Sequence, residues 1–111
     1  MTECIFCKII QGAIPGDIVF QDEHLLVLKD LNPQAPDHLL VIPRLHYSDI
    51  VEASKDSTLL SALLTKCASL GQEMGKEGFR IVINTGVHGG QTVQHLHFHV
   101  LAGRHLQWPP G

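Results

Sequence analysis

Histidine is concentrated near the end of the chain, in a spacing that could support chemistry. Of the eight histidines in 111 residues, His95, His97 and His99 occupy alternate positions of the segment QHLHFHV. Alternate side chains of an extended strand share one face and stand roughly 6–7 Å apart. Three imidazoles on one face can be solvated, bind a metal or react, although ligands at this spacing diverge and would close on one ion only with strain. A neutral imidazole, with a pKa of about 6.5, is a competent nucleophile near neutral pH.

A glycine-rich segment directly precedes these histidines. Gly89 and Gly90 would let backbone N–H groups approach a phosphate, and Gln91 and Thr92 could add side-chain donors. A glycine pair usually means only a turn between two strands. The position beside the histidines is what makes this segment a candidate anion site.

Two cysteines near the N-terminus have the spacing of metal ligands. Cys4 and Cys7 would lie on one face of a short helix, and a closed tetrahedral site would need two more ligands. Small apolar packing is the alternative for such a pair. Cys67 falls on the apolar face of a longer helix and is expected in the core.

The apolar pattern predicts the elements that must position these groups. Helices are expected over 4–11 and 57–74, the second capped by Asp56 or Ser57. Strands are expected over 17–21, 24–29, 38–42, 79–84 and 93–102. Short turns join most of the strands. The prediction is one α+β domain over residues 1–111, with a five-stranded antiparallel sheet and two helices.

Composition excludes several classes of function. The formal net charge is -3 and no basic run occurs, so nucleic acid is not expected as a main partner. No apolar run approaches the ~20 residues that span a bilayer, and the first residues lack signal-peptide architecture. Three cysteines make a disulfide framework improbable. These features predict a cytoplasmic protein without a membrane partner, whose small core would gain from a metal or a partner subunit.

Several motifs resemble those of one known family. His95–Leu101 fits the pattern His-φ-His-φ-His-φ-φ of the histidine triad (HIT) superfamily, where φ is apolar. The segments IFCKII, DLNPQAPDH, VIP, GGQTV and the ending WPPG are similar to its nucleotide-binding protein branch. This resemblance implies a HIT-like fold whose sheet continues across a homodimer. It also implies hydrolysis of purine nucleoside 5′-phosphoramidates through a covalent nucleotidyl-histidine.

The resemblance also implies roles for single residues. His97 would be the nucleophile and His99 a donor to the phosphate. Thr92 would contact the phosphate or the leaving group, and His38 would help to set the protonation of the triad. The nucleotide-binding set would be Phe6, Ile9, Ile14, Asp30, Leu31, Asn84, Gly90, Gln91, Thr92, His97 and His99. Within this set, Asp30 would accept the ribose hydroxyls, although a carboxylate before Asn32-Pro33 can equally close an Asx turn. A buried, satisfied histidine is the alternative for His38.

Zinc and the partners are further implications of the family. Branches with the cysteine pair bind zinc through two additional histidines, which correspond here to His46 and His95. Such zinc would be structural, with no cofactor required for catalysis. The ligands would be AMP, GMP and nucleoside phosphoramidates, and Trp108 would line the partner's active site. Two other functions remain open: a zinc-stabilised module that binds purine nucleotides, and a dinucleoside polyphosphate hydrolase.

Overall fold

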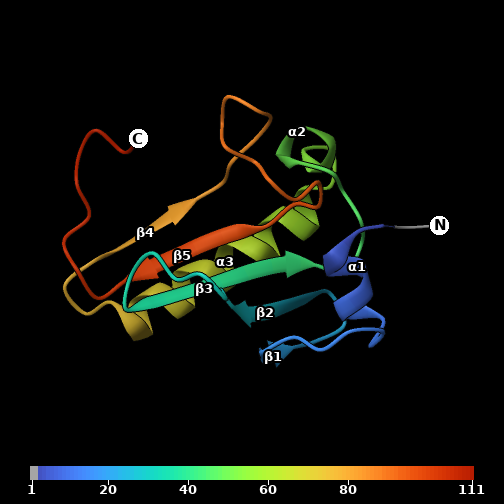
Figure 1. Ribbon diagram of the computed structural model, residues 1–111, viewed down its shortest axis with the longest axis horizontal. Helices are drawn as coiled ribbons and strands as arrows, with labels where there is room; N and C mark the ends of the chain where they lie inside the picture. The colour runs from blue at the N-terminus through green and yellow to red at the C-terminus, as the bar shows by residue number, and fades with distance from the viewer. Residues whose placement is uncertain (1–2) are drawn as a thin grey trace.

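The computed structural model describes residues 3–111 as an α+β fold built on one antiparallel sheet (Figure 1). Its five strands lie in the order β1-β2-β3-β5-β4, and every neighbouring pair is antiparallel. In chain order the elements are α1 (Ile5–Ile10), β1 (Ile18–Gln21), β2 (Leu25–Lys29), β3 (Asp37–Pro43), α2 (Ile50–Ala53), α3 (Ser57–Met74), β4 (Phe79–Val82) and β5 (Phe98–Ala102).

Helix α3 covers one face of the sheet, behind β3 and β5 in Figure 1. It begins after Asp56, whose carboxylate accepts the N–H of Leu59, so the predicted cap and both predicted helix ends are confirmed. Its apolar residues at spacings of three and four meet the sheet in the larger core cluster. No helix in residues 3–111 is long and apolar enough to cross a membrane.

Helix α1 lies over the opposite face and covers only part of it. Phe6 packs there on alternate residues of β2 and β3, which form the second core cluster with it: Leu26, Leu28, Leu40 and Ile42. Because α1 has six residues, the rest of this face lies open to a pocket.

The last strand is shorter than predicted. Residues 93–97 are not part of the sheet, and β5 begins only at Phe98. The predicted alternation persists nonetheless, because Leu96, Phe98 and Val100 are all buried in the core beneath α3. The expectation that all three triad histidines stand on one strand is wrong, since the chain bends before Phe98.

Two smaller differences concern the remaining elements. The structure has a third helix, the single-turn α2, which Asp49 caps by accepting the N–H of Glu52. Four residues are too few for apolar periodicity to reveal a helix. The strand expected over 79–84 ends at Val82, after which the glycine-rich segment departs from the sheet.

The packing beneath α3 gives a first prediction. Leu63 is fully buried, whereas its neighbour Leu64 is 45% exposed. We expect Leu63→Ala to lower the free energy of unfolding by about 2–5 kcal/mol, because it removes buried methyl groups and leaves a cavity. Leu64→Ala is the matched control and should cost less than about 1 kcal/mol. Urea unfolding of both variants at one protein concentration measures this, and equal losses would contradict the assignment of the core.

Candidate functional site

His97 is held in one orientation by the backbone two residues before it. Its Nδ1 lies 2.7 Å from the carbonyl oxygen of His95. A carbonyl oxygen only accepts, so Nδ1 carries the proton and donates it to this bond. In the neutral ring Nε2 then has a lone pair. His97 is buried and lines the pocket, so an imidazole of nucleophilic form stands at its wall.

A second chain of hydrogen bonds runs through His38 to His99. The backbone N–H of Gln34 donates to Nδ1 of His38 at 3.0 Å, so the proton of the neutral His38 ring is on Nε2. That Nε2–H donates to Nδ1 of His99 at 2.9 Å, with Oδ2 of Asp30 at 3.4 Å as a second acceptor. His99 accepts at Nδ1 and therefore carries its own proton on Nε2. His99 can therefore donate from Nε2, whereas His97 has a lone pair on Nε2.

Burial keeps these rings neutral. It lowers the pKa of His99 to about 4, and the neighbouring His97 and His38 add to the shift. The pKa of His38 is also lowered by burial, against the opposing attraction of Asp30. Near pH 7 both rings are uncharged, as the chain of hydrogen bonds requires.

The histidines open into a pocket of about 720 Å³ between α1 and the sheet. One part of its wall is apolar and is formed by Phe6, Ile9, Ile14, Leu28 and Leu40. Another part carries polar and charged side chains, with Leu31 beside them: Asp17, Lys29, Asp30, Thr92, His97 and His99. This volume suits a nucleotide-sized ligand with one flat apolar end and one polar end.

Three predicted residues of the nucleotide site lie outside this lining: Asn84, Gly90 and Gln91. The side chain of Gln91 is occupied within its own loop, contrary to the expectation of a phosphate donor. Its Nε2 donates to the carbonyls of Ser48 and Val93, and its Oε1 accepts the N–H of Gly86. Gln91 therefore holds the loop in shape.

The glycines of this loop are required by its backbone. Gly86 and Gly90 have φ of 74° and 83°, which disfavours any residue with a Cβ. A Cβ on Gly89 would lie 2.2 Å from the carbonyl oxygen of Thr85. The tight loop brings Thr92 to the pocket.

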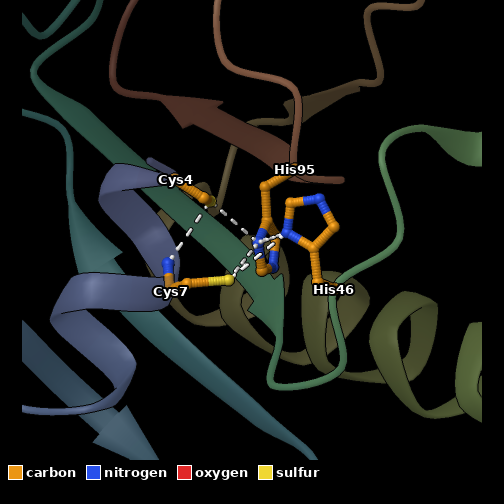
Figure 2. Close-up of side chains that lie close together, drawn as sticks. All are labelled: Cys4, Cys7, His46 and His95. Carbon is orange, nitrogen blue, oxygen red and sulfur yellow. Dashed lines mark hydrogen bonds between the residues drawn. The ribbon is translucent and has the colours of Figure 1, made fainter. Parts of the chain in front are cut away.

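Four side chains from three parts of the chain converge beside the pocket (Figure 2). Nδ1 of His95 lies 3.3 Å from Sγ of Cys4 and 3.6 Å from Sγ of Cys7. Nδ1 of His46 lies 3.3 Å from Sγ of Cys7 and 3.1 Å from Nδ1 of His95. Zn–S bonds of about 2.3 Å and Zn–N bonds of about 2.0–2.1 Å make the edges of a ligand tetrahedron about 3.3–3.8 Å. The spacings are close to those edges, so these residues fit a tetrahedral zinc ion.

The proton arrangement of His95 also suits a ligand. Its Nε2–H donates to the carbonyl of Pro43 at 2.9 Å, which leaves the lone pair on Nδ1, facing the cysteines. Burial lowers the pKa of His95 to about 4, so the ring is neutral. The carbonyl of His95 also orients His97, two residues later in the chain. This hydrogen bond connects the four-residue group to the pocket.

A second group, Asp30, His38 and His99, also has ligand atoms within 4.8 Å of one another. His38 accepts at Nδ1 and donates from Nε2, so in this arrangement it has no lone pair for an ion. We therefore interpret this group as a hydrogen-bonded network.

Sequence reasoning missed several contributors to the site, among them Asp17 and Lys29 at the pocket wall. Leu28 and Leu40 form part of the apolar wall, and they could have been found from the two-residue period of their strands. The backbone N–H of Gln34, which orients His38, carries no signal in the sequence because every residue except proline offers one.

Known proteins are similar to this chain in fold and in sequence. Residues 3–107 match the family model described as scavenger mRNA decapping enzyme C-term binding. An uncharacterized HIT-like protein of Synechococcus elongatus is 50% identical, over 98% of this chain and 97% of its own. A HIT family hydrolase from Legionella pneumophila has a TM-score of 0.93 and 46% identity, over 98% of this chain and 100% of its own. A histidine triad nucleotide-binding protein from Candida albicans has a TM-score of 0.80 and 30% identity, over 96% of this chain and 83% of its own.

The family of these relatives is consistent with the histidines found at the site. The matches extend over almost the whole chain, and the histidines of the repeated pattern stand at the pocket and at the four-residue group. Because a family model matches residues 3–107 and a HIT-like relative is 50% identical over 98% of the chain, this chain belongs to the histidine triad superfamily.

Proposed function

We propose that this protein hydrolyses the P–N bond of purine nucleoside 5′-phosphoramidates, releasing a purine nucleoside monophosphate and an amine. The observation that carries the proposal is the fixed tautomer of His97. Its lone pair is available on Nε2 at the wall of a nucleotide-sized pocket, with His99 set as a donor beside it. Family membership supports hydrolysis in general, and cleavage of a P–N bond is the more specific proposal.

The pocket accounts for each part of such a substrate. The apolar wall around Phe6 and Ile9 suits the flat face of a purine. Asp30 accepts the N–H of Asn32 with one oxygen, as in an Asx turn, and keeps lone pairs for ribose hydroxyls. The N–H of His99 and the hydroxyl of Thr92 would donate to phosphate oxygens.

The reaction would proceed in two displacements at phosphorus. In the first, Nε2 of His97 forms a bond to phosphorus, the P–N bond to the amine breaks, and the departing nitrogen takes one proton from solvent. In the second, water attacks phosphorus, the bond to His97 breaks, and the proton of the water returns to solvent. The carbonyl of His95 stabilises the positive charge that develops on the ring of His97, because Nδ1–H already points at it.

Removing the nucleophile tests the proposal. In His97→Ala, kcat for an adenosine phosphoramidate should fall by about three orders of magnitude or more, while the Kd for AMP changes by less than about threefold. Release of AMP and calorimetric binding of AMP measure the two quantities. His24→Ala, an exposed histidine in the turn between β1 and β2, is the control and should match the unaltered protein.

Acid quenching gives a complementary test. Peptide mapping should then find AMP on His97, whereas a label on His99 would overturn the assignment. Binding without turnover, in the unaltered protein, would favour a nucleotide-binding module. Faster cleavage of dinucleoside polyphosphates than of phosphoramidates would favour the other hydrolase branch.

We propose that Cys4, Cys7, His46 and His95 hold one structural zinc ion. The ion would link α1 to the segments after β3 and before β5, and so hold the wall of the pocket against the backbone that orients His97. Catalysis by His97 and His99 would not pass through it.

Metal analysis tests the zinc site. Protein purified without chelators should contain about one zinc per chain, and Cys4→Ser should lose it because a tetrahedral site needs all four ligands. Cys67→Ala is the control, since Cys67 is buried on the face of α3 that packs on the sheet, and its thiol pKa is raised to about 12 by burial. Less than a tenth of an equivalent in the unaltered protein would refute the site.

We also propose a homodimer in which β4 continues the sheet into a second copy. Strand β4 is a sheet edge with a regular register, and Phe79 on it is 39% exposed. The other edge, β1, is interrupted by an irregularity between Ile18 and Phe20. Trp108 is 80% exposed, on a tail whose carbonyls accept hydrogen bonds from Arg80. We propose that it lines the partner's active site, on the side of the substrate's leaving group.

Sedimentation equilibrium tests this assembly. The expected mass at micromolar concentration is twice 12.2 kDa. A proline in β4 is a poor test, because it could also disturb the pairing of β4 with β5 inside one chain. Phe79→Glu adds charge at the edge and should raise the dimer dissociation constant about tenfold or more. Because the Phe79 ring also lies against Gly71 of α3, circular dichroism must show that the variant keeps its fold. A mass of 12.2 kDa for the unaltered protein would exclude the dimer.

A further inference from the structure

We propose that Arg104 is a positioning residue for the pocket, which acts through Gln34 to fix the protons on His38 and His99. The inference rests on the proposed function for its effect on turnover, but its structural part can be measured without any substrate. Arg104 follows β5 and lines no part of the pocket.

The Arg104 side chain donates a fork of hydrogen bonds to two backbone carbonyls. Nε and Nη2 of Arg104 donate to the carbonyl oxygen of Gln34 at 3.1 and 2.9 Å, and Nη1 donates to the carbonyl of His105 at 3.1 Å. The planar guanidinium thus joins two backbone segments 70 positions apart. Two donors on one carbonyl define where Gln34 lies.

Hydrogen bonds connect Gln34 to the histidines of the site. Its backbone N–H is the donor to Nδ1 of His38, whose Nε2–H in turn donates to His99. The side-chain Nε2 of Gln34 donates to the carbonyl of Asn32, and the N–H of Asn32 donates to Asp30. The loop that Arg104 holds therefore carries both the residue that orients His38 and the carboxylate proposed to bind ribose.

Packing beside Arg104 supports the same contact. A Cβ on Gly103 would lie 2.8 Å from Cβ and 3.1 Å from Cγ of Pro36, and its φ is 101°. Only glycine allows the chain after β5 to turn so closely against this loop. Two consecutive residues, Gly103 and Arg104, thus contact the loop from Gln34 to Pro36 by different means.

The contact between Arg104 and Gln34 would keep the protons of His38 and His99 on Nε2. If the N–H of Gln34 moves away, His38 can carry its proton on Nδ1 and accept at Nε2. His99 would then donate from Nδ1 and be left with a lone pair on Nε2. A lone pair there would repel a phosphate oxygen where a donor is needed.

Nitrogen NMR of protein with ¹⁵N-labelled histidine reads this arrangement directly. In the unaltered protein, Nδ1 of His38 should have the shift of an unprotonated nitrogen and Nε2 that of a protonated one. In Arg104→Met the two shifts should move toward each other, and kcat/KM should fall roughly fivefold, the effect of about one hydrogen bond. Arg104→Lys, which keeps a donor, should restore part of both.

Arg44→Met is the matched control. Arg44 also donates to backbone and side-chain oxygens, at Asp22 and Gln21, but in the hairpin of β1 and β2. It should leave the His38 shifts and kcat/KM unchanged. In a His38→Asn background, Arg104→Met should cause no further loss of kcat/KM.

The outcomes separate this inference from the proposed function. Unchanged His38 shifts in Arg104→Met would overturn the inference, as would an equal change in Arg44→Met. A full further loss in the His38→Asn background would also overturn it, because Arg104 would then act by another route. Absence of phosphoramidate hydrolysis in the unaltered protein would overturn the proposed function alone, since the shifts are measured without substrate.

Discussion

The site depends on the hydrogen bond from Nδ1–H of His97 to the carbonyl of His95. This bond leaves the lone pair of His97 on Nε2, and it holds the ring before any ligand arrives. The carbonyl is itself fixed, because His95 is fully buried and donates from Nε2 to Pro43. Leu96, between the two histidines, is anchored by its N–H to Tyr47 and by burial beneath α3. A group oriented in advance needs little reorganisation when charge develops on it.

Backbone groups set the protons of three histidines in this protein. The carbonyls of His95 and Pro43 set those of His97 and His95, and the N–H of Gln34 sets that of His38. Peptide groups do not titrate in the range where histidine does, so these tautomers persist while the rings stay neutral. Burial widens the pH range over which His95 and His38 stay neutral, because it lowers the pKa of His95 to about 4 and also lowers that of His38.

One face of the sheet carries the main core, and the other faces the pocket. The face beneath α3 is filled by packed side chains and supplies the main core. On the other face the short helix α1 leaves room for a ligand, and Phe6 places its ring edge-on to both His95 and His97. Helix α1 thereby contributes to the apolar wall and to the four-residue group at once, so a change in its position would affect both.

The sequence by itself determined most of the regular elements and the kinds of chemistry available, but neither α2 nor the start of β5. The period of α3, its cap Asp56 and the apolar alternation of Leu96, Phe98 and Val100 are local patterns, which is why they predicted the structure. Residue types and spacing left open which histidine serves which group; the family resemblance suggested an assignment, and the tertiary structure brings the groups together. His95 meets Cys4 across 91 positions and His99 meets His38 across 61, while Gln91 turns inward to hold its loop. These contacts depend on where a strand ends and where a carbonyl lies after folding, and backbone hydrogen-bonding groups are the same at nearly every position of a sequence.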